Sequence, residues 1–220
     1  MTMNAEFEGL IRLCTVWVIY FAIHSLFASV TFKGFVENRW PNMMIYYRAI
    51  FNCIALLLLI PPFYLSSKLN SVPLWEWHGQ LAWFANTSAG LAVLGILSTL
   101  RGYDGLAFLG FRQIKKHSTN VESDLNISFP HRFVRHPWYF FALVIIWTRN
   151  FDQIFLVTAS MITLYFIIGS RLEEKKLITI HGQSYRSYQK KVPGLIPRPW
   201  RYLDENSARE IEQKTKDISN

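Results

Sequence analysis

The sequence predicts an all-α membrane protein, a polytopic bundle of about five transmembrane helices in which the last two form a helical hairpin. Three observations support this prediction. Apolar residues make up 51% of the 220 residues. Only 17% are charged, against about 25% in an ordinary soluble domain. Long apolar stretches also recur along the chain, and a bilayer core of about 30 Å requires about 20 such residues per helix.

Three stretches have the length of a full span: residues 10–30, 46–65 and 81–100. The first is interrupted by Arg12 and His24, the second begins near Arg48, and the third carries no charge. Acidic residues precede the first stretch, and no small-residue cleavage site follows it. We therefore interpret it as a helix rather than a cleaved signal peptide.

The fourth apolar stretch, residues 137–169, is too long for one span and is interrupted at Arg149, Asn150 and Asp152. It divides into helices over 137–148 and 154–169, each short for a full crossing. The pattern predicts a helical hairpin with its tip near residues 149–152, tilted or only partly crossing the bilayer.

The basic residues predict the orientation. Of the 23 Lys and Arg, 20 lie in segments 31–48, 101–135 and 171–220, which five crossings bring to one side. By the positive-inside rule, we expect the N-terminus outside and the C-terminus in the cytoplasm. The location that we expect is a bacterial inner membrane. We assign the net charge of +8 to a membrane surface rather than to nucleic acid. The tryptophans, most of them near span ends, match an interfacial aromatic belt.

We expect one integral membrane domain over 1–204, made of N-terminal helices over 10–100 and a catalytic core over 101–204. Residues 205–220 form a polar tail, expected to be a solvated helix or disordered. Cys14 and Cys53 both lie inside apolar runs. No disulfide framework and no metal site are therefore expected.

Ionisable clusters lie at the predicted cytoplasmic edge. In the first, Arg135 and His136 precede Pro137, which suits the first turn of a helix. A helix N-terminus with such neighbours is a natural seat for a carboxylate or another anion. The alternative is that Arg and His only anchor the helix to lipid headgroups.

A second cluster contains Glu173 and Glu174, at a helix exit where a cation is more usual. They could bind hydroxyls or an amine of a ligand, or form a solvated charged turn paired with neighbouring lysines. Further on, Tyr185 and Tyr188 share one helix face. The proline-rich segment 192–199 could fold back as a lid.

In this order, these elements resemble the C-terminal core of the membrane-embedded methyltransferases, which include isoprenylcysteine carboxyl methyltransferases and bacterial methanethiol S-methyltransferases. The matching motifs are Arg-His-Pro-x-Tyr at 135–139, Glu-Glu-x-x-Leu at 173–177, Gly-x-x-Tyr-x-x-Tyr at 182–188 and Val-Pro at 192–193. Segments 24–29, 47–52 and 108–113 look like the methanethiol enzymes, although the NnrU family shares the His-Ser helix.

The resemblance implies S-adenosyl-L-methionine-dependent methylation of a small thiol, most simply methanethiol to dimethyl sulfide. It implies a cofactor site on the cytoplasmic side, formed by Gln113, His131, Arg135, His136, Pro137, Trp138, Tyr139 and Glu173. The chain departs from the pattern at Phe141, where a Gly is frequent, and at Gly169. The isoprenylcysteine enzymes carry a substrate-contacting Arg at the latter position, so Gly169 argues against a prenylated acceptor.

A thiol must react as thiolate, so a base or positive potential is required. We expect His24 to act as the base, the alternative being a helix-packing histidine. Arg171, with Arg135, supplies positive charge. Two other functions remain open: methylation of an isoprenylcysteine or a lipid headgroup, and a NnrU-like haem protein with His24, His78 or His136 as axial ligand.

Overall fold

A computed structural model describes residues 3–100, 105–116 and 125–219. Parts of the predicted basic segment 101–135, namely 101–104 and 117–124, lie outside the described residues, as does residue 220 of the predicted tail. The described chain is almost entirely helical, which confirms the all-α prediction. It divides into two compact units. The first comprises Met1–Glu76, Asp104–Val121 and Asn150–Ile162, and the second comprises Trp77–Tyr103, Glu122–Arg149 and Thr163–Asn220.

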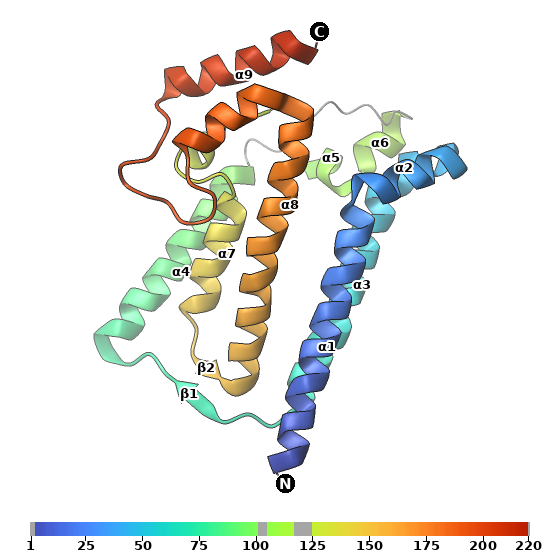
Figure 1. The fold of residues 1–220 in the computed structure, drawn as a ribbon. Helices are drawn as coiled ribbons and strands as arrows, with labels where there is room; N and C mark the ends of the chain where they lie inside the picture. The colour runs from blue at the N-terminus through green and yellow to red at the C-terminus, as the bar shows by residue number, and fades with distance from the viewer. Residues whose placement is uncertain (1–2, 101–104, 117–124, 220) are drawn as a thin grey trace. The chain divides into compact units, whose positions relative to one another are not determined.

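The first unit is built on two long apolar helices that lie side by side (Figure 1). Its elements are α1 (Met3–Ala28), α2 (Val30–Arg39), η1 (Pro41–Met43), α3 (Met44–Lys68), β1 (Pro73–Trp75), α5 (Gly105–Leu109), α6 (Phe111–Lys116), β2 (Phe151–Asp152) and the first turns of α8 (Gln153–Lys191). The strands pair antiparallel, with Pro73 opposite Asp152. The apolar core centres on Leu13, Trp17 and Ile154.

The second unit contains α4 (Gly79–Leu100), η2 (Phe129–Arg132), α7 (Pro137–Trp147), the rest of α8 and α9 (Glu205–Ser219). Helix α4 packs against α7, and Gly95 makes this approach possible, since a Cβ there would lie 2.5 Å from the Phe141 ring. Phe141, one of the departures from the family pattern, is thus accommodated by a glycine on the facing helix.

The predicted hairpin is present. Helix α7 ends at Trp147 and α8 begins at Gln153, and Trp147 Nε1 donates to Thr163 Oγ1 across the pair at 3.0 Å. The expected helix end at residue 169 is wrong, because α8 continues to Lys191. It bends at Gly182, whose φ of 55° is one that side-chain-bearing residues rarely adopt. Glu173 and Glu174 are therefore helical residues, and the charged-turn alternative is not what forms.

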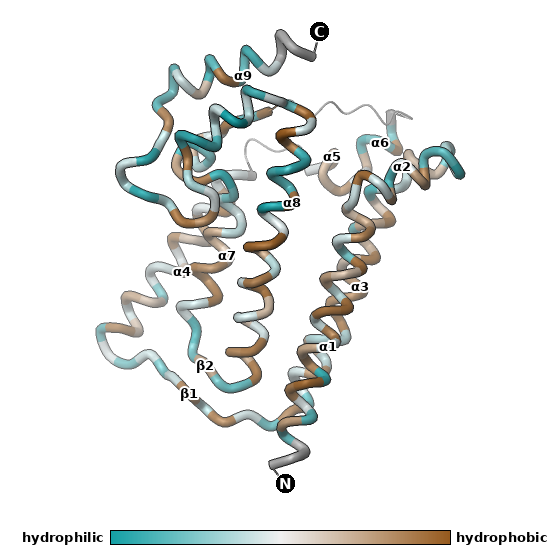
Figure 2. Tube along the Cα trace, in the orientation of Figure 1, coloured by the Kyte–Doolittle hydropathy of each residue, from teal (hydrophilic) through white to brown (hydrophobic). Residues whose placement is uncertain are grey.

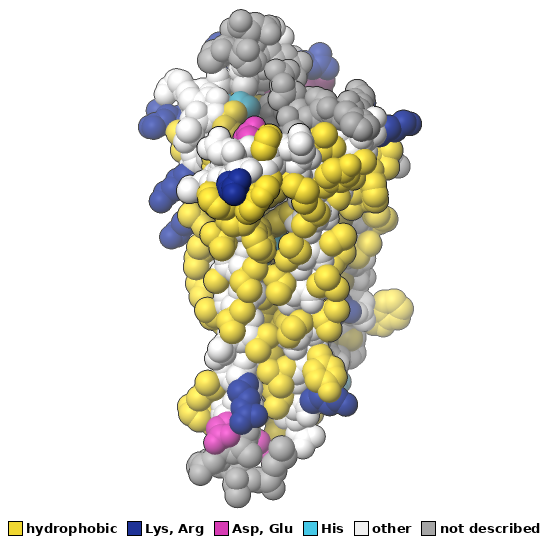
Figure 3. All heavy atoms as spheres, turned by 90° about the vertical axis from the view of Figure 1, so that its right-hand side faces the viewer, with side chains coloured by type: hydrophobic (Ala, Val, Ile, Leu, Met, Phe, Trp, Pro, Cys, Tyr) yellow, Lys and Arg dark blue, Asp and Glu magenta, His cyan; other side chains and the backbone are white. Residues whose placement is uncertain are grey.

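Among the described residues, four helices are long and apolar enough to cross a membrane: Glu6–Ala28, Pro41–Lys68, Gly79–Thr99 and Gln153–Lys191. Pro137–Trp147 is a shorter apolar helix. Apolar residues run along these helices (Figure 2). Their side chains are exposed, Leu56 and Phe84 by 68% each, and hydrophobic side chains cover the face seen in Figure 3. A surface this apolar marks an integral membrane protein.

The C-terminal segment forms a helix, as the first of the two alternatives for the tail predicted. It is not solvated on all sides, because Ala208, Ile211 and Thr215 are buried. Ala208 and Ile211 belong to a core cluster with Tyr185 and Tyr188 of α8.

Candidate functional site

The Arg-His-Pro segment leads into α7 as the sequence predicts. Pro137 occupies the first turn of α7, where a missing N–H leaves no bond unmade. His136 immediately precedes the helix and is buried. Trp138 and Tyr139 follow in the first turn, both partly buried. The α7 entrance therefore holds four of the expected cofactor residues in one turn of chain.

Glu174 is the centre of a buried ionic cluster. Its Oε1 lies 2.6 Å from Arg135 Nη2, and it accepts from Arg135 Nε at 2.8 Å. The same oxygen lies 3.0 Å from His136 Nε2, while Oε2 accepts from Gln189 Nε2 at 2.9 Å. The side chains of Glu174 and Arg135 are 14% and 11% exposed. Glu174 is thus fully engaged inside the protein.

Arg135 also secures the end of α8 and the segment that follows it. Its Nη1 donates to the carbonyl of Gln189 at 3.1 Å and to that of Val192. Its backbone N–H donates to Pro193 O at 2.9 Å, and the His136 N–H donates to Gly194 O at 3.1 Å. The proline-rich segment therefore does fold back, onto the entrance of α7.

Glu173 differs from its neighbour. Its side chain is 49% exposed, and its Oε2 lies 3.3 Å from His136 Nδ1. Both ring nitrogens of His136 therefore face carboxylates, so axial ligation of a haem iron by His136 would require giving up one of these contacts. The opposing carboxylates raise the pKa of His136, although burial, the largest single effect, lowers it.

A stack of three rings continues from His136. The His136 and Tyr139 rings are parallel within 9°, with centroids 5.4 Å apart. Tyr139 in turn stacks on Phe166 of α8 at 4.5 Å. Gly169, at the position of the prenyl-substrate Arg, leaves space beside Tyr139, whose Oη is 4.0 Å from where a Cβ would lie. The ring stack gives the cluster an aromatic wall.

His131 lies just before this cluster. Its Nδ1 is 2.7 Å from Ser128 Oγ, and its carbonyl accepts from Tyr188 Oη at 2.6 Å. Burial lowers the pKa of His131 to about 4, and the positive charge on His136 contributes, while Glu173 partly opposes the shift. His131 is therefore neutral at pH 7, while the raised pKa of His136 favours its protonated form.

Arg171, expected to act beside Arg135, does not join the cluster. Its side chain is exposed and forms no hydrogen bond or ion pair with the described residues. The charge of Arg135 is taken up by Glu174. Of the two arginines expected to supply positive charge, only Arg171 has no carboxylate partner among the described residues.

The other two expected site residues belong to the first unit. Gln113 on α6 is buried, and its Nε2 donates to Ala107 O at 3.2 Å, while its Oε1 has no partner within the described ranges. His24 on α1 packs against Phe51 of α3, with ring centroids 5.1 Å apart. These ring contacts are typical of helix packing, and the role of His24 as a base stays a proposal.

Two motifs of the N-terminal half meet within this unit. Arg48 donates to Ala107 O and Asn52 to Phe108 O, both at 3.0 Å, so α3 holds the α5–α6 turn. The turn passes through Gly110, whose φ is 91°. A Cβ at Gly110 would lie 2.6 Å from the Ala49 nitrogen. The sequence resemblance thus covers residues that contact one another.

Comparison with known proteins extends over most of the chain. A methanethiol S-methyltransferase of Crocosphaera subtropica is 28% identical over 194 residues, which cover 79% of this chain and 69% of that protein. Methanethiol S-methyltransferase 2 of Bradyrhizobium diazoefficiens is 26% identical over 81% of this chain and 70% of its own length. That of Pseudomonas deceptionensis is 40% identical, over 35% of this chain and 30% of its own.

The chain is thus similar in sequence, over most of its length, to proteins named methanethiol S-methyltransferase. No family model matches it, and no solved structure does. The resemblance stated from the motifs is thereby confirmed, and the enzyme class that it supports is methyltransferase.

The sequence motifs include Glu174 without assigning it to the site, and they give no indication of Gln189 or Gly194. A signal was present for Glu174. Glu174 lies at helical spacing from other residues of one helix face, namely Ser170, Leu177, Ile178 and His181. Ser170 and His181 on this face are buried. Glu173 lies about 100° around the helix from that face, which is why it is the more exposed of the two.

Proposed function

We propose that the chain transfers a methyl group from S-adenosyl-L-methionine to a small thiol, with methanethiol as acceptor and dimethyl sulfide as product. The observation that carries the proposal is the His136 cluster, in which Glu173 keeps about half of its carboxylate side chain exposed beside partners that are buried. The printed names of the relatives support the choice of acceptor.

The donor set fits this cofactor. The exposed carboxylate of Glu173 is a suitable acceptor for ribose hydroxyls or for the amine of the methionyl group. Aromatic faces attract cations, so the stack of Tyr139 on Phe166 suits a sulfonium. We assign binding to His131, Arg135, His136, Pro137, Trp138, Tyr139 and Glu173. The assignment of Gln113, which belongs to the first unit, is supported by the sequence resemblance alone.

When bound, S-adenosyl-L-methionine supplies an already activated methyl group. The protein then has to align donor and acceptor and exclude water. Glu174 is a positioning residue in this scheme, because it fixes both His136 and Arg135. Arg135 in turn holds the segment 192–194 at the entrance of α7. The acceptor reacts as thiolate. His24 is the proposed base, and the charge of Arg171, which no described carboxylate neutralises, favours the thiolate.

Calorimetry with S-adenosylhomocysteine tests the cofactor site. Glu173→Gln keeps the side-chain shape but removes the charge. Losing a charge-assisted hydrogen bond of about 1.5–3 kcal/mol should weaken binding about 10- to 150-fold. Glu210→Gln on α9, an exposed carboxylate paired with Lys214, is the matched control and should bind as the wild type does. Equal affinity of Glu173→Gln and wild type would refute the site.

Headspace detection of dimethyl sulfide from membranes given S-adenosylmethionine and methanethiol tests the acceptor. His24→Ala should lower the rate near neutral pH, and higher pH should partly restore it by ionising the thiol directly. No dimethyl sulfide, together with methylation of a farnesylcysteine analogue or a phospholipid, would favour the other methyltransferase function instead.

The proposed location is a bacterial inner membrane, with the N-terminus outside and the C-terminus cytoplasmic. The distribution of basic residues supports it. Single cysteines at Asn70 and Ser207, placed in a chain without Cys14 and Cys53, report the orientation. An impermeant thiol reagent added from outside should label the cysteine at 70 and spare the one at 207. The reverse pattern would invert the topology.

A further inference from the structure

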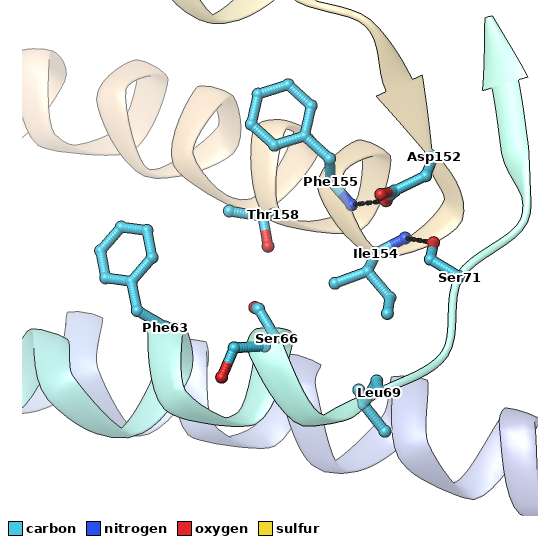
Figure 4. Close-up of a pocket in the computed structure, with 9 residues that line it drawn as sticks. Phe63, Ser66, Leu69, Ser71, Asp152, Ile154, Phe155 and Thr158 are labelled. Atoms are coloured by element: carbon cyan, nitrogen blue, oxygen red, sulfur yellow. Dashed lines mark hydrogen bonds between the residues drawn. The ribbon is translucent and has the colours of Figure 1, made fainter.

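The first unit contains a pocket that none of the residues of the Glu173 cluster lines. It opens between the last turns of α3 and the first turns of α8 (Figure 4). Phe63 and Leu69 of the first segment and Ile154 and Phe155 of the second form its apolar walls. Thr158 also lines it, fifteen residues before Glu173 on the same helix.

Thr158 is the unusual member of this pocket. The residue is 5% exposed, yet its hydroxyl has no hydrogen-bond partner among the described residues. A helical threonine normally bonds the carbonyl one turn back, and a buried polar group without a partner costs free energy. Figure 4 shows this hydroxyl directed into the pocket, toward α3. An occupant with a complementary polar atom would satisfy it.

The wall formed by α3 offers hydrogen-bond acceptors as well as apolar side chains. The Ser66 hydroxyl donates to the carbonyl of Pro62 at 2.8 Å, and the Ser67 hydroxyl donates to that of Tyr64 at 2.7 Å. Because their protons are used, these oxygens are available only as acceptors.

The pocket does not suit an anion. No Lys, Arg or His lines it. The first N–H groups of α8, which could otherwise bind an anion, are already used: Gln153 N donates to Val72 O, Ile154 N to Ser71 Oγ and Phe155 N to Asp152 Oδ1. Asp152 also lines the pocket, with its Oδ1 bonded to the Phe155 N–H, while the other walls are mostly apolar. We therefore favour a small neutral ligand with an apolar body and one polar atom.

We propose that this pocket binds a small neutral thiol or thioether, with the Thr158 hydroxyl as its polar contact. The choice of sulfur compounds among small neutral molecules rests on the proposed function. A thioether sulfur would accept from the hydroxyl, and a thiol would donate weakly to it. A ligand of two or three heavy atoms binds no tighter than about the millimolar range, so exchange is fast.

Cysteine trapping tests the proposal without turnover or cofactor. Cys14 and Cys53 are replaced by Ala, and Thr158→Cys is introduced. Methyl methanethiosulfonate then transfers its CH3S group to the new thiolate, forming a disulfide and releasing methanesulfinate. Thr99→Cys is the matched control, a buried position on α4 whose native hydroxyl already donates to Ile96 O at 2.6 Å.

We expect labelling of Thr158→Cys by this small neutral reagent, slow labelling by a trimethylammonium analogue, and little labelling of Thr99→Cys. Dimethyl sulfide should protect Thr158→Cys saturably, slowing labelling about tenfold at ten times its dissociation constant. Absence of labelling, protection equal to that given by hexane, or protection by lipid alone would overturn the proposal.

A second measurement covers the case in which Thr158→Cys fails to fold. Dimethyl sulfide should raise the unfolding temperature of the unmodified chain, and Ser66→Phe, whose ring fills the pocket, should abolish that shift. An equal shift in both chains refutes the site. Protection and thermal shift in a chain without methyl transfer would refute the proposed function and leave this pocket standing.

Discussion

The apolar helices and the segment that follows Gly169 differ in where their large apolar side chains lie. On α3 and α4, side chains such as Leu56 and Phe84 point outward. Beyond Gly169, Tyr185, Val192 and Leu203 are almost fully buried, while Ile196 and Trp200 stay exposed. Apolar side chains therefore form the outer surface of the first region, where lipid is the solvent, and also build a buried core in the second.

The second region also holds the buried ionic cluster around Glu174. Breaking this cluster should give the largest loss of unfolding free energy. Glu174→Ala leaves the buried Arg135 without its carboxylate. Such a loss costs about 3–5 kcal/mol of unfolding free energy. Glu173→Ala, the matched control one residue away, removes a half-exposed partner and should cost at most about 1 kcal/mol. Thermal unfolding in detergent measures both, and equal losses would contradict the assignment of Glu174 as the buried centre.

The two surfaces can be compared with one substitution type. Leu203→Ala removes packing from the core of the water-facing segment and should cost about 2–5 kcal/mol. Leu56→Ala, on an apolar helix, exposes no new cavity and should stay within about 0.5 kcal/mol. Unfolding in detergent gives the two values. A large loss at Leu56 would mean that this face is covered by protein rather than by lipid.

The smallest expected effect is one of pH. The unfolded chain protonates His131 near its ordinary pKa of 6.5, whereas the folded chain protonates it only near pH 4. Stability is therefore lost as pH falls from about 6.5 to 4. His136 has the opposite sign, because its raised folded pKa adds stability that is present below pH 6.5 and lost as pH rises through the folded pKa.

His131→Gln should consequently lose less stability than wild type between pH 6.5 and 5. Unfolding temperatures at the two pH values measure this difference. The other titratable groups are the same in both chains, so their contributions to the pH dependence of stability cancel in the comparison. Parallel pH dependence of His131→Gln and wild type would show that His131 is not the buried neutral group described.

The elements that the sequence predicted well are those with the strongest local signal. Residues 137–148 and 154–169 were expected as hairpin helices, and α7 ends at Trp147 while α8 begins at Gln153. The polar tip between them is a local break that no packing overrides. The same reasoning placed the end of α8 at residue 169, because the apolar run stops there. The helix continues because its later turns pack on their own core, with Tyr185 and Tyr188.

The helical class, the apolar spans, the hairpin and the order of the methyltransferase motifs can all be predicted from the sequence, since each is a local pattern of residue types. Tertiary contacts are what bury Glu174 rather than Glu173, and they pair Arg135 with this carboxylate. They also leave the Thr158 hydroxyl facing a pocket without a partner among the described residues. Adjacent residues on a helix share almost the same sequence neighbours, but their side chains point about 100° apart. Only the surrounding elements therefore decide which of the two carboxylates is buried against a partner.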